Sequence, residues 1–187
     1  MPTYVALLRG INVGGSKKIK MEQLRRSFAE LGLEDVHTYI QTGNVIFKTG
    51  DMAAVELTQR AEDKILSDFG LSVRVILRTA VELGQSIRNN PFTQRKGIQP
   101  AQLHVFFLSR VPTKTAVKEL EALPAGTAEL RWCGRELYLH TPDGFGRTKL
   151  PNFDKVLSVT ATARNWNTVN KLYQLASEAP AAKRAGR

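Results

Sequence analysis

The sequence has 187 residues, of which 42% are hydrophobic and 24% are charged. These proportions are typical of a globular chain of ordinary domain size and exclude an intrinsically disordered protein. The 27 Lys and Arg residues against 17 Asp and Glu give a net charge of +10, which favours association with polyanions without specifying a fold.

The first half of the chain predicts the order strand, helix, hairpin, helix, strand, helix. Its first strand is apolar almost throughout, which indicates a central position in a sheet. The last strand alternates, with Leu71, Val73, Val75 and Leu77 on one face. The predicted ranges, in chain order, are 3–9, 21–31, 36–41 and 45–48, 51–69, 71–78 and 79–89.

A polar stretch from Asn90 to Pro100 predicts an internal boundary. Beyond it the order strand, helix, hairpin recurs and is followed by two short helices, with predicted ranges 102–109, 113–123, 127–132 and 136–140, 152–159, and 165–177. The repeated order predicts an internal duplication. We therefore expect an α+β protein in which residues 1–90 form a first βαββαβ half with a trailing helix. Residues 101–178 form a second βαββ half with C-terminal helices, and residues 179–187 a disordered basic tail.

The loop Gly10–Lys20 is the most informative segment for function. It follows a strand and precedes a helix, the context in which backbone N–H groups bind phosphate. Gly15 is followed by Ser16 and then Lys17, the reverse of the order in a nucleotide-hydrolysing P-loop, so we exclude that activity. Two alternatives stay open: an anion site built from glycines and lysines, or a turn whose glycines adopt positive φ beside solvated lysines.

Three further segments are candidates for binding. Gly144–Lys149 is a second loop of glycines and cations, for which a flexible surface loop is the equal alternative. Gln41–Asn44 forms a polar hairpin tip that is either a tight turn or a ligand rim. Near the last helix, Asn165 is interpreted as an N-cap and Trp166 as core, whereas Arg164 and Asn167 have no such structural explanation.

Other chemistry has little support in the sequence. The three histidines, His37, His104 and His140, are isolated and are interpreted as structural. No Cys/His cluster has zinc spacing, so we expect neither a metal nor a cofactor, and no residue is indicated as catalytic. Cys133 is the single cysteine, which excludes an intrachain disulfide and favours a reducing, cytoplasmic location. The apolar runs are too short to cross a membrane, and the sequence does not indicate an oligomeric state.

Three segments together resemble a known family: ALLRGINVGG (residues 6–15) with the following Lys-Ile-Lys-Met, YIQTGNVIF (39–47) and ARNWNTVNKL (163–172). The family is the bacterial one catalogued as domain of unknown function 1697. The resemblance implies a two-part α+β fold with ferredoxin-like βαββαβ halves, and it implies no activity. The matching residues are Arg9, Asn12, Gly14, Gly15, Gln41, Gly43, Asn44, Arg164, Asn165, Trp166 and Asn167.

Our leading hypothesis is that the protein binds a phosphate-bearing polyanion such as nucleic acid through its basic glycine-rich loops. Tyr39, Phe47 and Phe106 are aromatic residues of predicted strands that are candidates for stacking on bases. The alternatives are a small-molecule enzyme acting on a phosphorylated or carboxylated substrate, in a cleft lined by the motif residues, and a protein-interaction module. The candidate anion-binding residues are Arg9, Asn12, Gly14, Gly15, Lys17, Lys18, Gln41, Asn44, Arg147, Lys149, Arg164 and Asn167.

Overall fold

The computed structural model describes residues 1–15, 17–50, 52–124 and 126–178. The first half contains β1 (Thr3–Leu8), α1 (Met21–Ala29), β2 (Glu34–Tyr39), β3 (Asn44–Lys48), α2 (Ala54–Phe69), β4 (Val75–Thr79) and α3 (Ala80–Arg88). The second half contains β5 (Leu103–Leu108), α4 (Lys114–Glu121), β6 (Glu129–Cys133), β7 (Glu136–His140), α5 (Phe153–Leu157), β8 (Ala161–Asn165) and α6 (Trp166–Glu178). Two short 3-10 helices, η1 (Pro100–Gln102) and η2 (Phe145–Arg147), lie in the second half.

Each half builds one antiparallel four-stranded sheet. The strand orders are β2-β3-β1-β4 and β6-β7-β5-β8, so every strand has a counterpart at the same place in the other sheet. The order of helices and strands also repeats from one half to the other. The α+β fold of two similar halves predicted from the sequence is therefore confirmed, with the repeated topology that an internal duplication predicts.

One element was missed in the sequence. We predicted two consecutive short helices after the second hairpin, but β8 lies between α5 and α6. The second half is therefore βαββαβ with a trailing helix, like the first, and the prediction of a βαββ half was incomplete. The predicted tail, residues 179–187, lies outside the described residues.

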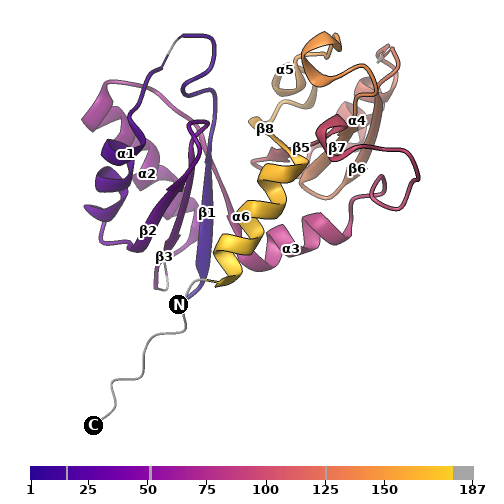
Figure 1. Cartoon of the computed structure of the whole chain (residues 1–187). Coiled ribbons are helices and arrows are strands. Elements are labelled where there is room, and N and C mark those ends of the chain that lie inside the picture. The colour runs from indigo at the N-terminus through magenta and orange to yellow at the C-terminus, as the bar shows by residue number, and fades with distance from the viewer. Residues whose placement is uncertain (16, 51, 125, 179–187) are drawn as a thin grey trace.

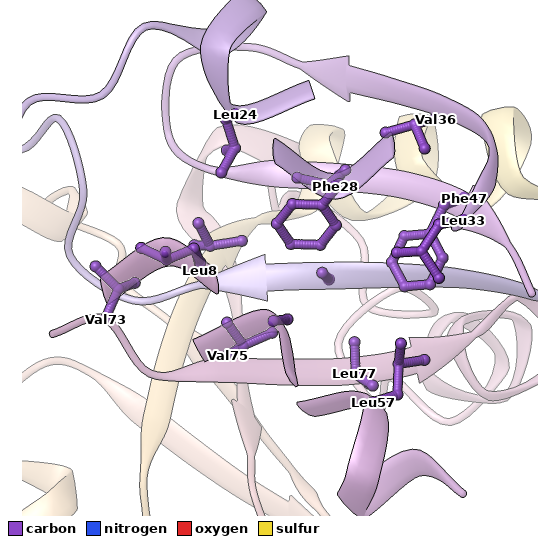
Figure 2. Close-up of a cluster of buried hydrophobic side chains, with 14 of the residues drawn as sticks. Leu8, Leu24, Phe28, Leu33, Val36, Phe47, Leu57, Val73, Val75 and Leu77 are labelled. Carbon is purple, nitrogen blue, oxygen red and sulfur yellow. The ribbon is translucent and has the colours of Figure 1, made fainter. Parts of the chain in front are cut away.

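Helices and sheets form alternating layers (Figure 1). Helices α1 and α2 cover the outer face of the first sheet, α4 and α5 cover the outer face of the second, and α3 and α6 lie between the sheets. The outer core of the first half is shown in Figure 2, where Phe28 of α1 and Leu57 of α2 face Phe47 and Leu77 of the sheet.

Strand β1 is apolar on both of its faces, because one face packs on the outer helices and the other on the middle layer. In β1, Ala6 and Leu8 contribute to the outer core, whereas Val5 and Leu7 contribute to a second core that both halves share. This explains the nearly continuous apolar sequence of β1, which lies between β3 and β4 as predicted. The alternation predicted for residues 71–77 is also confirmed, because this face packs on the outer core.

The last helix holds the two halves together. Trp166, Val169 and Leu172 of α6 are buried in the shared core, and α6 packs against β1 and β3 of one sheet and against β5 and β8 of the other. Trp166 is thus a core residue, as predicted. Asn165 caps the helix, since its Oδ1 accepts a hydrogen bond from the Thr168 N–H at 2.8 Å.

Candidate functional site

The first glycine-rich loop is closed at its base by Asn12. The Asn12 Nδ2 donates to the Ile19 and Gln41 carbonyls at 2.9 and 2.8 Å, and its Oδ1 accepts from the Ile19 N–H at 2.9 Å. The residue itself adopts a positive φ of 54°, which asparagine tolerates better than most residues. These hydrogen bonds occupy both ends of the Asn12 amide, so the side chain shapes the loop, and anion binding by Asn12 stays a prediction.

The tip of this loop is exposed and tightly turned. Gly14 and Gly15 have φ values of 62° and 80°, as the turn alternative predicted. Lys17 and Lys18 are exposed beside them. The Lys17 ammonium donates to the Ser72 carbonyl at 2.7 Å, which fixes the loop against the segment before β4. The loop therefore presents cations on its rim, and anion binding by these residues stays a prediction.

Arg164, by contrast, is buried between the two halves. Its side chain is 6% exposed. Its Nη2 donates to the Leu8, Thr42 and Gly43 carbonyls at 2.9, 3.2 and 3.0 Å. Burial lowers the pKa of the Arg164 guanidinium to about 10, which leaves it charged at neutral pH.

Asn44 is the partner of this arginine across the interface. It is fully buried, and its Oδ1 accepts a hydrogen bond from the Arg164 Nε at 2.5 Å. Its Nδ2 donates to the Tyr39 carbonyl at 3.0 Å. Asn44 and Arg164 are therefore structural, and the prediction that they bind an anion is wrong. The small-molecule enzyme alternative needs the motif residues to line an open cleft. Asn44 and Arg164 are buried and do not line one.

Two of the remaining motif residues, Gln41 and Asn167, are exposed. Gln41 is exposed at the hairpin tip, and its carbonyl accepts the hydrogen bond from Asn12. Asn167 is exposed on the first turn of α6. Gly43 has a φ of 79°, and a Cβ there would lie 2.7 Å from the Ile11 side chain. Only glycine fits this turn without displacing its neighbours.

Arg9, which precedes the first loop, meets the second half directly. Its Nη1 forms an ion pair with Asp154 at the start of α5. Both residues line a cavity of about 460 Å³, which we call the interface cavity. The rest of its lining comes from the second half: Phe106, Phe145, Thr148, Leu150, Pro151, Asn152, Phe153 and Ala161.

The second glycine-and-cation loop, Gly144–Lys149, thus contributes to the same cavity as Arg9. Arg147 and Lys149 are exposed on either side of Thr148. Residues 147–155 contain three cations and one acid, Asp154. Figure 1 shows the first loop and the α5 region at the same end of the molecule. The two loops that the sequence identified separately therefore lie at the same end of the molecule (Figure 1).

The three aromatic residues predicted to stack on bases lie in different places in the structure. Phe47 is 1% exposed in the outer core, so its predicted role in stacking on a base is wrong. Tyr39 packs against the shared core, whereas Phe106 lines the interface cavity. Sequence reasoning missed Phe145, Asn152 and Asp154, although Phe145 lies inside the loop already singled out for its glycines and cations.

His104 packs against the ring of Phe145, with centroids 4.2 Å apart. Burial lowers its pKa to about 4, so the imidazole is neutral at physiological pH. The contact with Phe145 is the kind of packing expected of a structural histidine. Within the described residues, no group of three His, Cys, Asp or Glu is placed to hold a metal.

None of the helices in the described part of the chain is long and apolar enough to span a membrane.

Comparison with known proteins agrees with this architecture. Residues 1–138 match the model of the family described as "Protein of unknown function (DUF1697)". The chain belongs to this family. The third motif, residues 163–172, lies beyond the residues of this chain that match the family model. The role of Arg164 within this motif is therefore inferred from its hydrogen bonds in the structure. No curated protein matches the chain.

A solved structure described as "The structure of conserved bacterial protein SP0830 from Streptococcus pneumoniae" is similar over 94% of this chain and 98% of that chain. The TM-score is 0.73 and the sequence identity is 23%. This similarity concerns the fold alone, and it extends over both halves.

Proposed function

We propose that this member of the DUF1697 family binds a phosphate-bearing polyanion such as nucleic acid, with the two glycine-and-cation loops as its contact surface. The observation that carries the proposal is that Arg9 and the Gly144–Lys149 loop line one cavity. Cations from both halves thus lie at one end of the molecule. A cytoplasmic location, where nucleic acids are abundant, is part of this proposal.

Charge supports the proposal more than any single residue does. The net charge of +10 attracts a phosphate backbone over several ångströms, and the attraction is concentrated where cations outnumber acids. Lys18, Arg147 and Lys149 are exposed, so phosphates reach them without any change in the fold. Arg78 of β4 and Arg164 of β8 add to the net charge, but both are buried and donate hydrogen bonds to backbone carbonyls inside the protein.

The test is fluorescence anisotropy with labelled single-stranded and duplex oligonucleotides, at low and near-physiological salt. We expect submicromolar binding that persists at near-physiological salt. The triple variant Lys18→Ala, Arg147→Ala, Lys149→Ala should bind more weakly. Its log Kd should also depend less steeply on log salt, by about 0.7 for each phosphate of a single strand that the variant no longer neutralises.

A control variant with the same reduction in charge separates local contacts from overall attraction. Arg25→Ala, Lys96→Ala, Lys118→Ala removes three exposed cations that lie on α1, on the connection before β5 and on α4. This control should keep most of the affinity and the salt dependence of the native protein. Equal weakening in both variants, or binding that disappears at near-physiological salt, would contradict the proposed surface.

A further inference from the structure

The interface cavity has an aromatic wall that charge alone does not explain. Phe106 and Phe153 meet edge to face with centroids 4.5 Å apart, and Phe145 lies 6.2 Å from Phe106. All three rings line the cavity. Phe145 is 37% exposed, an unusual position for a large aromatic side chain in a polar, glycine-containing loop. The exposed ring of Phe145 is therefore accessible to a planar ligand.

Phe145 is also supported from behind. The His104 ring stacks on it with an interplanar angle of 26°. The His104 Nδ1 is buried without a hydrogen-bond partner among the described residues. Because His104 belongs to strand β5, this ring contact holds Phe145 against the sheet.

The polar atoms around the cavity complement this wall. Asn152 uses its Oδ1 to accept from the Lys155 N–H at 3.1 Å, and its Nδ2 carries two further donors. The Thr148 hydroxyl donates to the Gly144 carbonyl at 3.0 Å and retains the capacity to accept. Arg9 supplies a cation at the edge. A volume of about 460 Å³ is in the usual range of small-molecule sites.

We propose that the interface cavity receives one unpaired nucleobase of a bound single strand, stacked on Phe145 beside Phe106, with the adjoining phosphate on Arg9. This inference rests on the proposed function and narrows it from a polyanion to a single-stranded nucleic acid. Sequence-tolerant stacking of a base on an aromatic ring next to basic residues is the established way in which proteins hold single strands. A duplex cannot enter the cavity in this manner, because its bases are already stacked on one another.

The experiment compares oligothymidylate with an oligomer of abasic spacers that carries the same number of phosphates. We expect the native protein to bind oligothymidylate about tenfold more tightly than the abasic oligomer, the size that removal of one stacked base predicts. Phe145→Ala should remove this difference and leave the affinity for the abasic oligomer unchanged. Phe145→Trp should retain the difference, and the fluorescence of the new indole should be quenched by oligothymidylate only.

Equal binding of the two oligomers by the native protein would overturn the base pocket and leave polyanion binding intact. Adenosine monophosphate is the third ligand to be tested. If neither oligomer binds but adenosine monophosphate does, in a manner abolished by Phe145→Ala, then the proposed polyanion function is wrong and the cavity holds a free nucleotide. If none of the three binds, both proposals are wrong. Thermal denaturation of each variant shows that the fold is retained.

Discussion

Arg78 and Arg164 occupy the same position in the two halves, and each places its guanidinium in the opposite half. Arg78 of β4 is paired in register with Val5 of β1, and Arg164 of β8 with Val105 of β5. The Arg78 Nη2 donates to the Leu108 and Arg135 carbonyls at 2.9 and 3.1 Å. This repeats the hydrogen bonds of Arg164 with Leu8 and Gly43.

The two arginines differ in one respect. The Arg78 Nε donates to the carboxylate of Glu136 at 2.8 Å, whereas the Arg164 Nε donates to the neutral amide of Asn44. Glu136 and Asn44 are the first residues of β7 and β3, so they too are equivalent in the two halves. Each half thus receives a buried arginine from the other half, and of these two arginines Arg78 bonds a carboxylate whereas Arg164 bonds an amide.

Replacing Arg164 by methionine should lower the free energy of unfolding by about 2–6 kcal/mol. The buried Asn44 Oδ1 and the Leu8 carbonyl would each lose the donor that Arg164 provides, and each buried unpaired group costs about 1–3 kcal/mol. Urea denaturation followed by tryptophan fluorescence measures the change. Arg25→Met, at an exposed position on α1, should change stability by no more than about 0.5 kcal/mol. A decrease below about 1 kcal/mol in Arg164→Met would show that the buried arginine is not a structural link.

Gly43→Ala should destabilise the protein more than Gly15→Ala, although the two glycines have φ values of 79° and 80°. A Cβ at position 43 would lie 2.7 Å from Ile11 and 2.8 Å from Leu8, whereas nothing lies within 4 Å at position 15. We expect a cost of about 1–2 kcal/mol at position 15, from the left-handed backbone alone. Crowding should add about 1–3 kcal/mol at position 43. Equal thermal midpoints for the two variants would be inconsistent with a crowded turn.

His104 should make the protein less stable as the pH falls from about 6.5 to about 4. Its pKa is lowered to about 4 by burial from 6.5. In this range the unfolded chain binds a proton at His104 that the folded protein does not. The stability contributed by the neutral His104 is therefore complete above pH 6.5 and is lost as the pH falls toward 4. For a partly buried ring we expect about 1–2 kcal/mol. His104→Phe keeps a ring against Phe145 and removes the titration, so its unfolding free energy should fall less over this range. Parallel curves for the two proteins would rule this out.

Asp154→Asn should tighten oligonucleotide binding about two- to fivefold, because it removes the one acid that faces Arg9 in the interface cavity. The asparagine can still accept the hydrogen bond that the Asp154 Oδ1 receives from the Ala161 N–H at 2.6 Å. Arg9→Ala should weaken binding and lower its salt dependence. Anisotropy titrations of both variants check the signs, and a weaker complex for Asp154→Asn would mean that the polyanion lies elsewhere.

The sequence predicted those strands whose buried faces are apolar. Two patterns were enough to predict the strands β4 and β1. They are the alternation of Val73, Val75 and Leu77 and the unbroken apolar sequence of residues 3–8. Strand β8 was missed because its inward-facing residues include Thr162 and Arg164, which give no hydrophobic period. The duplication was the signal that would have found it, because the first half has a strand before its last helix.

The candidate site was predicted only where its residues are exposed. Lys18, Arg147 and Lys149 are on the surface as expected, whereas Arg164 and Asn44 looked like ligand-binding residues because polar residues in a motif are usually exposed. Nothing local distinguishes an arginine that binds a phosphate from one that binds buried carbonyls. The meeting of Arg9 with Asp154 joins positions far apart in the sequence, and only the packing of the two halves brings them together.

The shared core cannot form until α6, the last helix described, has been synthesised. The inner face of the first sheet, with Val5, Leu7 and Ile46, is covered by the last helix of the chain. Some 90 residues separate the end of α3 at Arg88 from the end of α6 at Glu178. At the usual rates of translation the ribosome needs on the order of 10 s to add them. For that interval the nascent first half carries an apolar face covered only by α3 and a set of carbonyls still without Arg164, the kind of exposed surface that makes a folding chain prone to aggregation.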